Sequence, residues 1–213
     1  MLVTPECRLS FPSLFRASAN KLQPNAEPKF GATLLFKKVT GDVRQDLPEL
    51  FNAMMACATE KWGADLSKVR LKSGILDGDK HNAKRVGEGK EPLAGFAGCW
   101  FVRGTSKIKP VVVDGARKII PDLAEKTVVP GMYAYAQIHA FAWDNPAQGK
   151  GVSFGIDQCQ VDLFKKYEPF VAAADPEKTF KPLATAAPGA NDPKNYQQAP
   201  AAPAASSAGP FDT

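Results

Sequence analysis

Several common sequence signatures are missing from this chain, and each absence narrows the class of protein. Its apolar stretches, such as KPVVVD and PLAGFAGCWF, are far shorter than the ~20 residues that a membrane-spanning helix needs. The N-terminal segment MLVTPECRLSF has no basic region followed by an apolar run, so we expect no secretory signal and no membrane partner. The sequence therefore predicts a soluble protein of the cytoplasm.

Metal-binding and disulfide patterns are also absent. The four cysteines, Cys7, Cys57, Cys99 and Cys159, are widely spaced, and no CxxC pair occurs. Such cysteines are typical of reduced, partly buried thiols, and with His81 and His139 they have no zinc spacing. Asp77-Gly78-Asp79 lacks the other ligands of a calcium loop and is typical of a tight turn. We expect no metal site.

Catalytic signatures are missing as well. The motifs GxxxxGK[ST], GxGxxG, HExxH and GxSxG do not occur. Asp114, Asp122 and Asp157 are carboxylates that a metal-dependent nuclease could use, although Asp114 is typical of a cap at a strand end. The sequence predicts a non-enzymatic protein with no catalytic residue and no cofactor.

The composition divides the chain into two parts. The chain has 213 residues, 44% of them hydrophobic, and a formal net charge of +5, which suits one domain with its own core. Residues 182–213 contain one lysine and two aspartates among alanine, proline and serine, so almost all the basic surplus lies before them. We predict a globular domain over residues 1–181 and a disordered Pro/Ala-rich tail over 182–213.

Apolar periodicity predicts several strands and one main helix. The helix covers Leu47–Trp62, with Asp46 as its cap, Pro48 in its first turn and Gly63 at its end. The predicted strands are Arg8–Arg16, Lys29–Lys38, Gly95–Arg103, Lys109–Asp114, Met132–Trp143 and Gly151–Val161, the third and fourth forming a hairpin.

The segments between these elements are less regular. We interpret residues 64–93 as a long, mobile, mostly basic connection, Pro121–Pro130 as a loop or short helix, and Tyr167–Ala174 as a short helix. Together the elements predict a mainly β, OB-fold-like barrel with one main helix. An immunoglobulin-like sandwich fits the same pattern.

The most informative segment is MYAYAQIHAFAW, which alternates between a wide and a small face. Tyr133, Tyr135, Phe141 and Trp143 lie on one face, and alanines dominate the other. A row of aromatic rings with polar edges is a platform on which unpaired bases can stack. The same face could equally pack under a helix or against a second subunit.

Basic residues accompany these aromatics along the chain. Those that could contact a nucleic-acid backbone include Arg70, Lys72, Arg103, Lys107, Lys109 and Lys150. Trp100 and Phe101 directly precede Arg103, so rings and cations alternate there. Each phosphate that such cations neutralise adds to a salt-sensitive affinity.

The chain also resembles a known family. RLSFPSLFRA, KFGATLLF, GCWFVRGTSKIKPVVVD, the Gly-Met-Tyr strand and KGVSFGIDQCQ after FAWDN are similar, in order and spacing, to motifs of single-stranded-DNA-binding proteins of tailed phages, once classed as a domain of unknown function. The resemblance runs from about Arg8 to Val161. It implies an OB-fold, sequence-independent binding of single-stranded DNA, and a role in phage replication or recombination.

By position, the resemblance adds residues to the predicted site. Trp100 belongs to the GCWF motif, Lys109 to KPVVVD, Tyr133 to the Gly-x-Tyr strand and Phe154 to VSFG. Many such proteins end in a strongly acidic tail with a terminal aromatic, which recruits partners and competes for the DNA groove. Here the tail is only weakly acidic, but Phe211 and Asp212 remain as predicted contacts for phage or host replication and recombination proteins.

The sequence thus predicts a bacteriophage protein that protects and organises single-stranded DNA in the bacterial host cell. The alternative is a phage structural or assembly protein that uses the aromatic face as a subunit interface. A homo-oligomer is compatible with either function.

Overall fold

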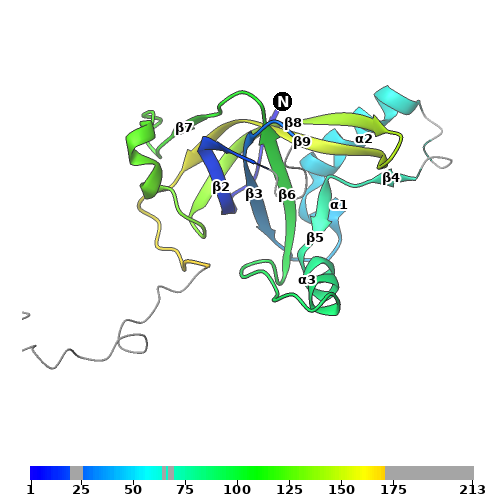
Figure 1. The fold of residues 1–213 in the computed structure, drawn as a ribbon, viewed down its shortest axis with the longest axis horizontal. Helices are drawn as coiled ribbons and strands as arrows, with labels where there is room; N and C mark the ends of the chain where they lie inside the picture. The colour runs from blue at the N-terminus through cyan, green and yellow to red at the C-terminus, as the bar shows by residue number, and fades with distance from the viewer. Residues whose placement is uncertain (20–25, 64–65, 67–69, 171–213) are drawn as a thin grey trace, which may run out of the picture. The chain divides into compact units, whose positions relative to one another are not determined.

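The computed structural model describes residues 1–19, 26–63, 66 and 70–170 (Figure 1). Its strands are β1 (Leu2–Val3), β2 (Cys7–Ser18), β3 (Lys29–Lys37), β4 (Leu71–Lys72), β5 (Ile75–Asp77), β6 (Cys99–Ser106), β7 (Val111–Val113), β8 (Tyr133–Asn145) and β9 (Gly149–Val161). Its helices are α1 (Val43–Asp46), α2 (Pro48–Trp62), α3 (Gly78–Gly87) and the 3₁₀ helix η2 (Asp122–Thr127). The fold is mainly β, as predicted.

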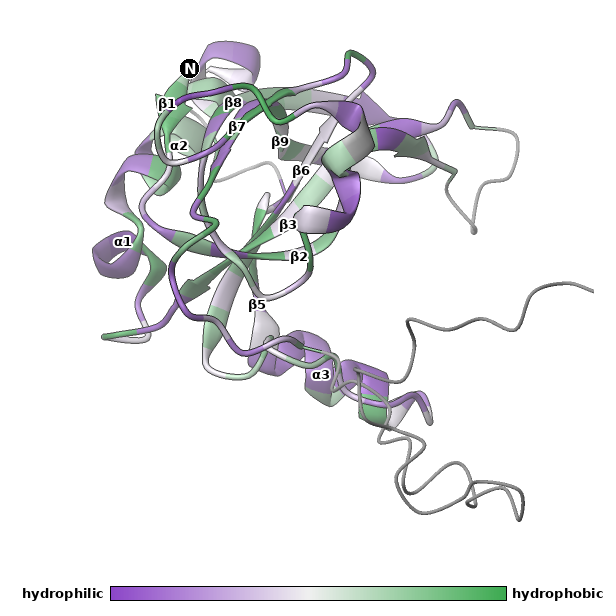
Figure 2. Ribbon diagram, turned by 90° about the vertical axis from the view of Figure 1, so that its left-hand side faces the viewer, coloured by the Kyte–Doolittle hydropathy of each residue, from purple (hydrophilic) through white to green (hydrophobic). Residues whose placement is uncertain are grey.

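Five of the strands close into a ring. Hydrogen-bonded neighbours follow the order β8-β2-β3-β6-β9, and pairing of β9 with β8 completes the circuit. All of these pairs are antiparallel except β6 with β9. This connectivity is consistent with an OB-like fold, and Figure 2 shows the five strands around the ring.

The small face of β8 points into the ring. Ala134, Ala136 and Ile138 are fully buried there and pack with Phe154 and Ile156 of β9. Alanines opposite phenylalanine and isoleucine let the interior fill without crowding. The aromatic face of β8 therefore lies on the outside, as the alternation predicts.

A second, smaller core lies on the outer surface of the ring. Leu35 of β3 and Phe101 of β6 pair across the sheet, and Phe96 from the segment after α3 covers both. The rings of Phe96 and Phe101 meet edge to face, with centroids 4.9 Å apart. Helix α3 itself is mostly hydrophilic (Figure 2), so this segment rather than the helix supplies the apolar cover.

Helix α2 forms where the sequence predicts it, except for its cap. Pro48 occupies the first turn, and Gly63 ends the helix with φ of 77°. The prediction that Asp46 caps this helix is wrong. Leu47 is the N-cap residue, and its side chain makes no capping hydrogen bond. The Asp46 carboxylate instead accepts hydrogen bonds from the backbone of Thr40 and Gly41, which closes the preceding loop.

The interpretation of residues 64–93 as a long, mobile connection also needs correction, because the segment contains regular elements. The described part of this segment contains β4, β5 and α3. Asp77-Gly78-Asp79 begins a helix rather than a tight turn, because Asp77 Oδ1 accepts the N–H groups of Asp79 and Lys80. Lys38 Nζ forms ion pairs with both aspartates at the start of this helix, at 2.6 Å from Asp77 and 2.7 Å from Asp79.

Two further predictions need correction. The strands near Cys99–Ser106 and Val111–Val113 do not form a hairpin, since both pair with β9, and both pair in parallel. Residues Tyr167–Phe170 are not helical, and the rest of that predicted helix lies outside the described residues. Pro121–Pro130 does contain a short helix, η2.

The predicted tail, residues 182–213 with Phe211 and Asp212, lies outside the described residues. In the described part of the chain, no helix is long and apolar enough to cross a membrane. The same part contains no cluster of side chains suited to a metal ion, and its four cysteines are free thiols.

Candidate nucleic-acid interface

Two rings of β8 lie flat against glycines of β9. The pairing places Trp143 opposite Gly151 and His139 opposite Gly155. A Cβ atom added at Gly155 would lie 2.3 Å from His139 Cε1, and one added at Gly151 would lie 2.5 Å from Trp143 Cζ2. Only glycine therefore permits these rings to rest on the neighbouring strand.

Polar contacts fix both rings at their edges. Trp143 Nε1 donates to Ser153 Oγ at 2.9 Å, and His139 Nδ1 lies 2.8 Å from Asp157 Oδ2. Phe141 lies between them on the same face, 38% exposed, with its ring centroid 6.3 Å from that of His139. The outer face of β8 thus presents aromatic side chains to solvent, and polar contacts fix the positions of two of them.

A row of mostly small residues continues from this face across the ring. Cross-strand pairing links Ser13, Gly31, Thr105, Gly155 and His139, one residue on each of β2, β3, β6, β9 and β8. Because most of these side chains are small, few atoms protrude from the outer surface of the sheet along this row. A chain crossing the strands at right angles could follow it.

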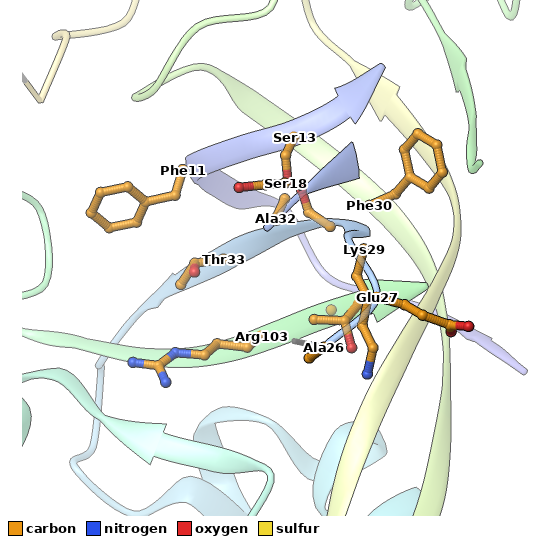
Figure 3. Close-up of a pocket in the computed structure, with 13 residues that line it drawn as sticks. Phe11, Ser13, Ser18, Ala26, Glu27, Lys29, Phe30, Ala32, Thr33 and Arg103 are labelled. Atoms are coloured by element: carbon orange, nitrogen blue, oxygen red, sulfur yellow. Dashed lines mark hydrogen bonds between the residues drawn. The ribbon is translucent and has the colours of Figure 1, made fainter. Parts of the chain in front are cut away.

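Two adjoining hollows lie along the row. One, of about 450 Å³, is lined by β2, β3 and β6 and includes Phe11 and Arg103 (Figure 3). The other, of about 390 Å³, includes Lys107, His139 and Phe141. Both are lined by Lys29 and Thr105, so they form one continuous feature, which we call the groove. The face made by the second and third strands is where OB-folds bind oligonucleotides.

Two of the four cations that line the groove are paired with carboxylates. Lys107 Nζ lies 2.5 Å from Glu27, and Lys109 contacts Asp122. The hydrogen bond from Lys107 lowers the pKa of Glu27, which is therefore ionised at neutral pH. Beyond the groove, Lys150 pairs with Asp144 at 3.0 Å near the β8–β9 turn. Arg103 is exposed on β6.

The structure brings only some of the predicted residues together. Arg103, Lys107, Lys109 and Phe141 line the groove. Trp143 and Lys150 lie beyond it toward the β8–β9 turn, where Lys72 of β4 pairs with Gly151 of β9. Arg70 is exposed just before β4.

Other predicted residues face elsewhere. Phe101 and Phe154 are fully buried in the two cores, so neither offers a ring face to a base. Trp100 is turned toward α1, where its Nε1 donates to Asp46 at 2.9 Å and Lys38 Nζ lies 4.6 Å from its ring centroid.

The two tyrosines are outward but lie outside the groove. Lys165 Nζ is 4.1 Å from the centroid of the Tyr133 ring and occupies one side of it. Tyr135 is 40% exposed, almost the same as Phe141, but is not among the residues that line the groove.

The structure adds residues that sequence reasoning missed. Phe11, Lys29 and His139 all line the groove. The one signal for Phe11 is Pro12, because proline within a strand is confined to edges and bulges. His139 lies on the aromatic face predicted from the alternation, and Lys29 begins a predicted strand.

Comparisons with known proteins assign the chain to a family. A family model described as Enterobacter phage Enc34, ssDNA-binding protein, matches residues 1–191. No curated protein sequence gives a significant match.

Solved structures share the fold. The single-stranded DNA-binding protein of bacteriophage Enc34 in complex with ssDNA superposes with a TM-score of 0.60 and 19% identity, covering 79% of this chain and 88% of that one. A second structure of that protein gives 0.58 and 18%, covering 84% and 89%. The single-stranded DNA-binding protein gp2.5 of bacteriophage T7 gives 0.52 and 11%, covering 78% and 92%. On the match of the family model, this chain belongs to the family of the Enterobacter phage Enc34 ssDNA-binding protein.

Proposed function

We propose that this chain is a phage protein that binds single-stranded DNA without sequence preference and holds it during replication or recombination in the infected cell. The observation that carries the proposal is the groove, which joins the exposed aromatic face of β8 to the cations of β3 and β6. Membership of the phage family supports it.

Base stacking and contacts between cations and phosphates both contribute to the proposed binding. A base laid on Phe141 stacks against an aromatic face, which contributes roughly 1–3 kcal/mol and tolerates any base because every base has a π-face. Lys29, Arg103 and Lys107 line the same groove, and their proposed role is to contact the phosphates of the strand. The proposal is of binding without catalysis.

Two parts of the proposal concern protein partners. Phe211 and Asp212 are proposed to recruit phage or host replication and recombination proteins, because an aromatic ring beside a carboxylate offers both an apolar and a charged contact. Self-association along a coated strand is proposed as well, since cooperative binding is common among proteins of this function.

Tryptophan fluorescence tests the central claim. Titrating the protein with poly-dT should change its tryptophan emission in a salt-sensitive manner, because Trp143 lies on the same face of β8 as Phe141, which lines the groove. If three or four phosphates are neutralised, the logarithm of the binding constant should fall with the logarithm of salt concentration with a slope of roughly −2 to −3. No binding at low salt would contradict the proposal and favour a role in assembly.

A matched pair of variants locates the interface. Phe141 and Tyr135 lie on the same face of β8 with 38% and 40% exposure, but only Phe141 lines the groove. We expect Phe141→Ala to weaken binding to a dT oligonucleotide by roughly 5-fold or more. Tyr135→Ala should have a smaller effect. The reverse order would show that DNA follows β8 rather than the groove.

A further inference from the structure

Phe11 has a backbone conformation that its residue type disfavours. Its φ is 47°, one of two positive values among the non-glycine residues that the structure describes. A bulky side chain seldom adopts this region, and the residue before a proline is normally extended. Strain of this kind persists where the surrounding structure enforces it, often at a binding site.

A bulge in β2 enforces the conformation. Ser10 pairs with Thr33 and Ser13 with Gly31, so three steps along β2 match two along β3. The extra residue lies within the Phe11-Pro12 segment, and Ser13 Oγ locks the register beyond it by donating to the Gly31 carbonyl at 3.1 Å. A bulge re-aims a side chain that regular pairing would place elsewhere.

The re-aimed ring is exposed yet held. The Phe11 side chain is 61% exposed, and its ring centroid lies 6.4 Å from that of Phe96. Phe96 is itself buried against Phe101 in the outer core. Phe11 is thus the solvent-facing end of a row of tilted aromatic contacts whose inner members, Phe96 and Phe101, are buried.

Its surroundings suit a nucleotide. Figure 3 shows Phe11 and Arg103 projecting toward the same side of the groove, with Thr33 between them. Ser10, Thr33 and Arg103 form one cross-strand row, so a cation lies two strands away from the ring. A ring face and a guanidinium on one side of a groove are the groups that a base and a phosphate of single-stranded DNA contact.

We propose that Phe11 is a second base-stacking platform, at the opposite end of the groove from Phe141, with Arg103 receiving the adjacent phosphate. The inference rests on the proposed function. It means that DNA crosses the whole ring from β8 to β2 instead of lying along β8 alone. The bulge is then a binding device, and the strained backbone is what holds its ring in place.

A glycine substitution separates binding from folding. Phe11→Gly removes the ring but suits the positive φ, so Tm should stay within a few degrees of wild type. Affinity for a dT oligonucleotide should fall roughly 5- to 150-fold, the loss of one stacked base. Phe164→Ala is the matched control, because Phe164 is 92% exposed outside the groove, and it should leave affinity unchanged.

A reporter then shows whether a base reaches the ring. Phe11→Trp should add emission that the oligonucleotide quenches beyond the quenching seen with wild type. Wild-type affinity in Phe11→Gly, or added emission that DNA leaves unquenched, would overturn the platform while the proposed function stands. Emission that shifts with protein concentration and not with DNA would assign the ring to a protein contact, again overturning it. Failure of the wild-type chain to bind would overturn both.

Discussion

Rings of β8 pack against Gly151 and Gly155 of β9, because only glycine, which has no Cβ atom, leaves room for them. The rings of Trp143 and His139 approach these glycines more closely than any Cβ atom would allow. Glycine in a strand interior is ordinarily unfavourable, since it costs entropy and packs nothing. Covering it with a ring recovers apolar contact and also flattens the ring against the sheet, which is the orientation that stacking requires.

Replacing one of these glycines should therefore disturb binding more than folding. In Gly155→Ala the new methyl group meets the imidazole of His139, which must give up its contact with Asp157 and turn away from the sheet. We expect a several-fold loss of oligonucleotide affinity, with Tm lowered by only a few degrees. Gly87→Ala is the control, because a Cβ there meets no atom within 4 Å. Equal affinities in both variants would show that the ring's position is irrelevant to binding.

On the scale of elements, Asp46 joins parts of the chain that are distant in sequence. Its carboxylate accepts N–H groups from Thr40 and Gly41 after β3 and the indole N–H of Trp100 in β6. The backbone hydrogen bond from Thr40, with those from Trp100 and Val39, holds its pKa far below the ordinary value of 3.8. The ionised carboxylate thus fastens the α1 region to β6.

These hydrogen bonds determine the direction in which pH changes the stability of the fold. Because the pKa of Asp46 is lower in the folded than in the unfolded chain, its contribution is complete above about pH 4 and is lost as the pH falls toward the folded value. Asp46→Asn should lower Tm at pH 7, and the difference from wild type should shrink at pH 3. Thermal unfolding of both proteins, followed by tryptophan fluorescence at the two pH values, measures this. A gap that is equal at both pH values would show that the charge is not the cause.

Local patterns account for the elements that the sequence predicts correctly. Alternation in β8 and helical spacing in α2 are visible because adjacent residues determine which face is buried. Helix α3 has no such pattern, since its stability comes from the Asp77 cap and from Lys38, which lies about forty positions earlier. Phe101 has the spacing of an outward ring, yet Leu35 of β3 and Phe96, five residues before it, bury it in the outer core. Tertiary contacts that the local pattern does not show decide which predicted aromatics reach the groove.

Across the whole molecule, the count of 27 lysines and arginines overstates the positive charge that is free to meet DNA. Lys107, Lys109 and Lys150 each contact a carboxylate of the same chain. A phosphate must displace these carboxylates in order to bind the lysines. Loss of the ion pairs therefore offsets part of the attraction between the lysines and DNA. DNA binding is then weaker, and exchange along a strand easier, than the number of cations implies.

Neutralising one carboxylate should therefore tighten binding. Glu27→Gln frees Lys107, a pair whose side chains are 72% and 70% exposed, so the gain should be small, roughly 2- to 5-fold in affinity at low salt. The salt dependence should become steeper, because one more cation is available to a phosphate. Glu88→Gln is the control, as Glu88 pairs with Lys84 and Lys90 at α3, away from the groove. Titration of both variants with a dT oligonucleotide at several salt concentrations decides the matter, since an unchanged slope in Glu27→Gln would mean that Lys107 meets no phosphate.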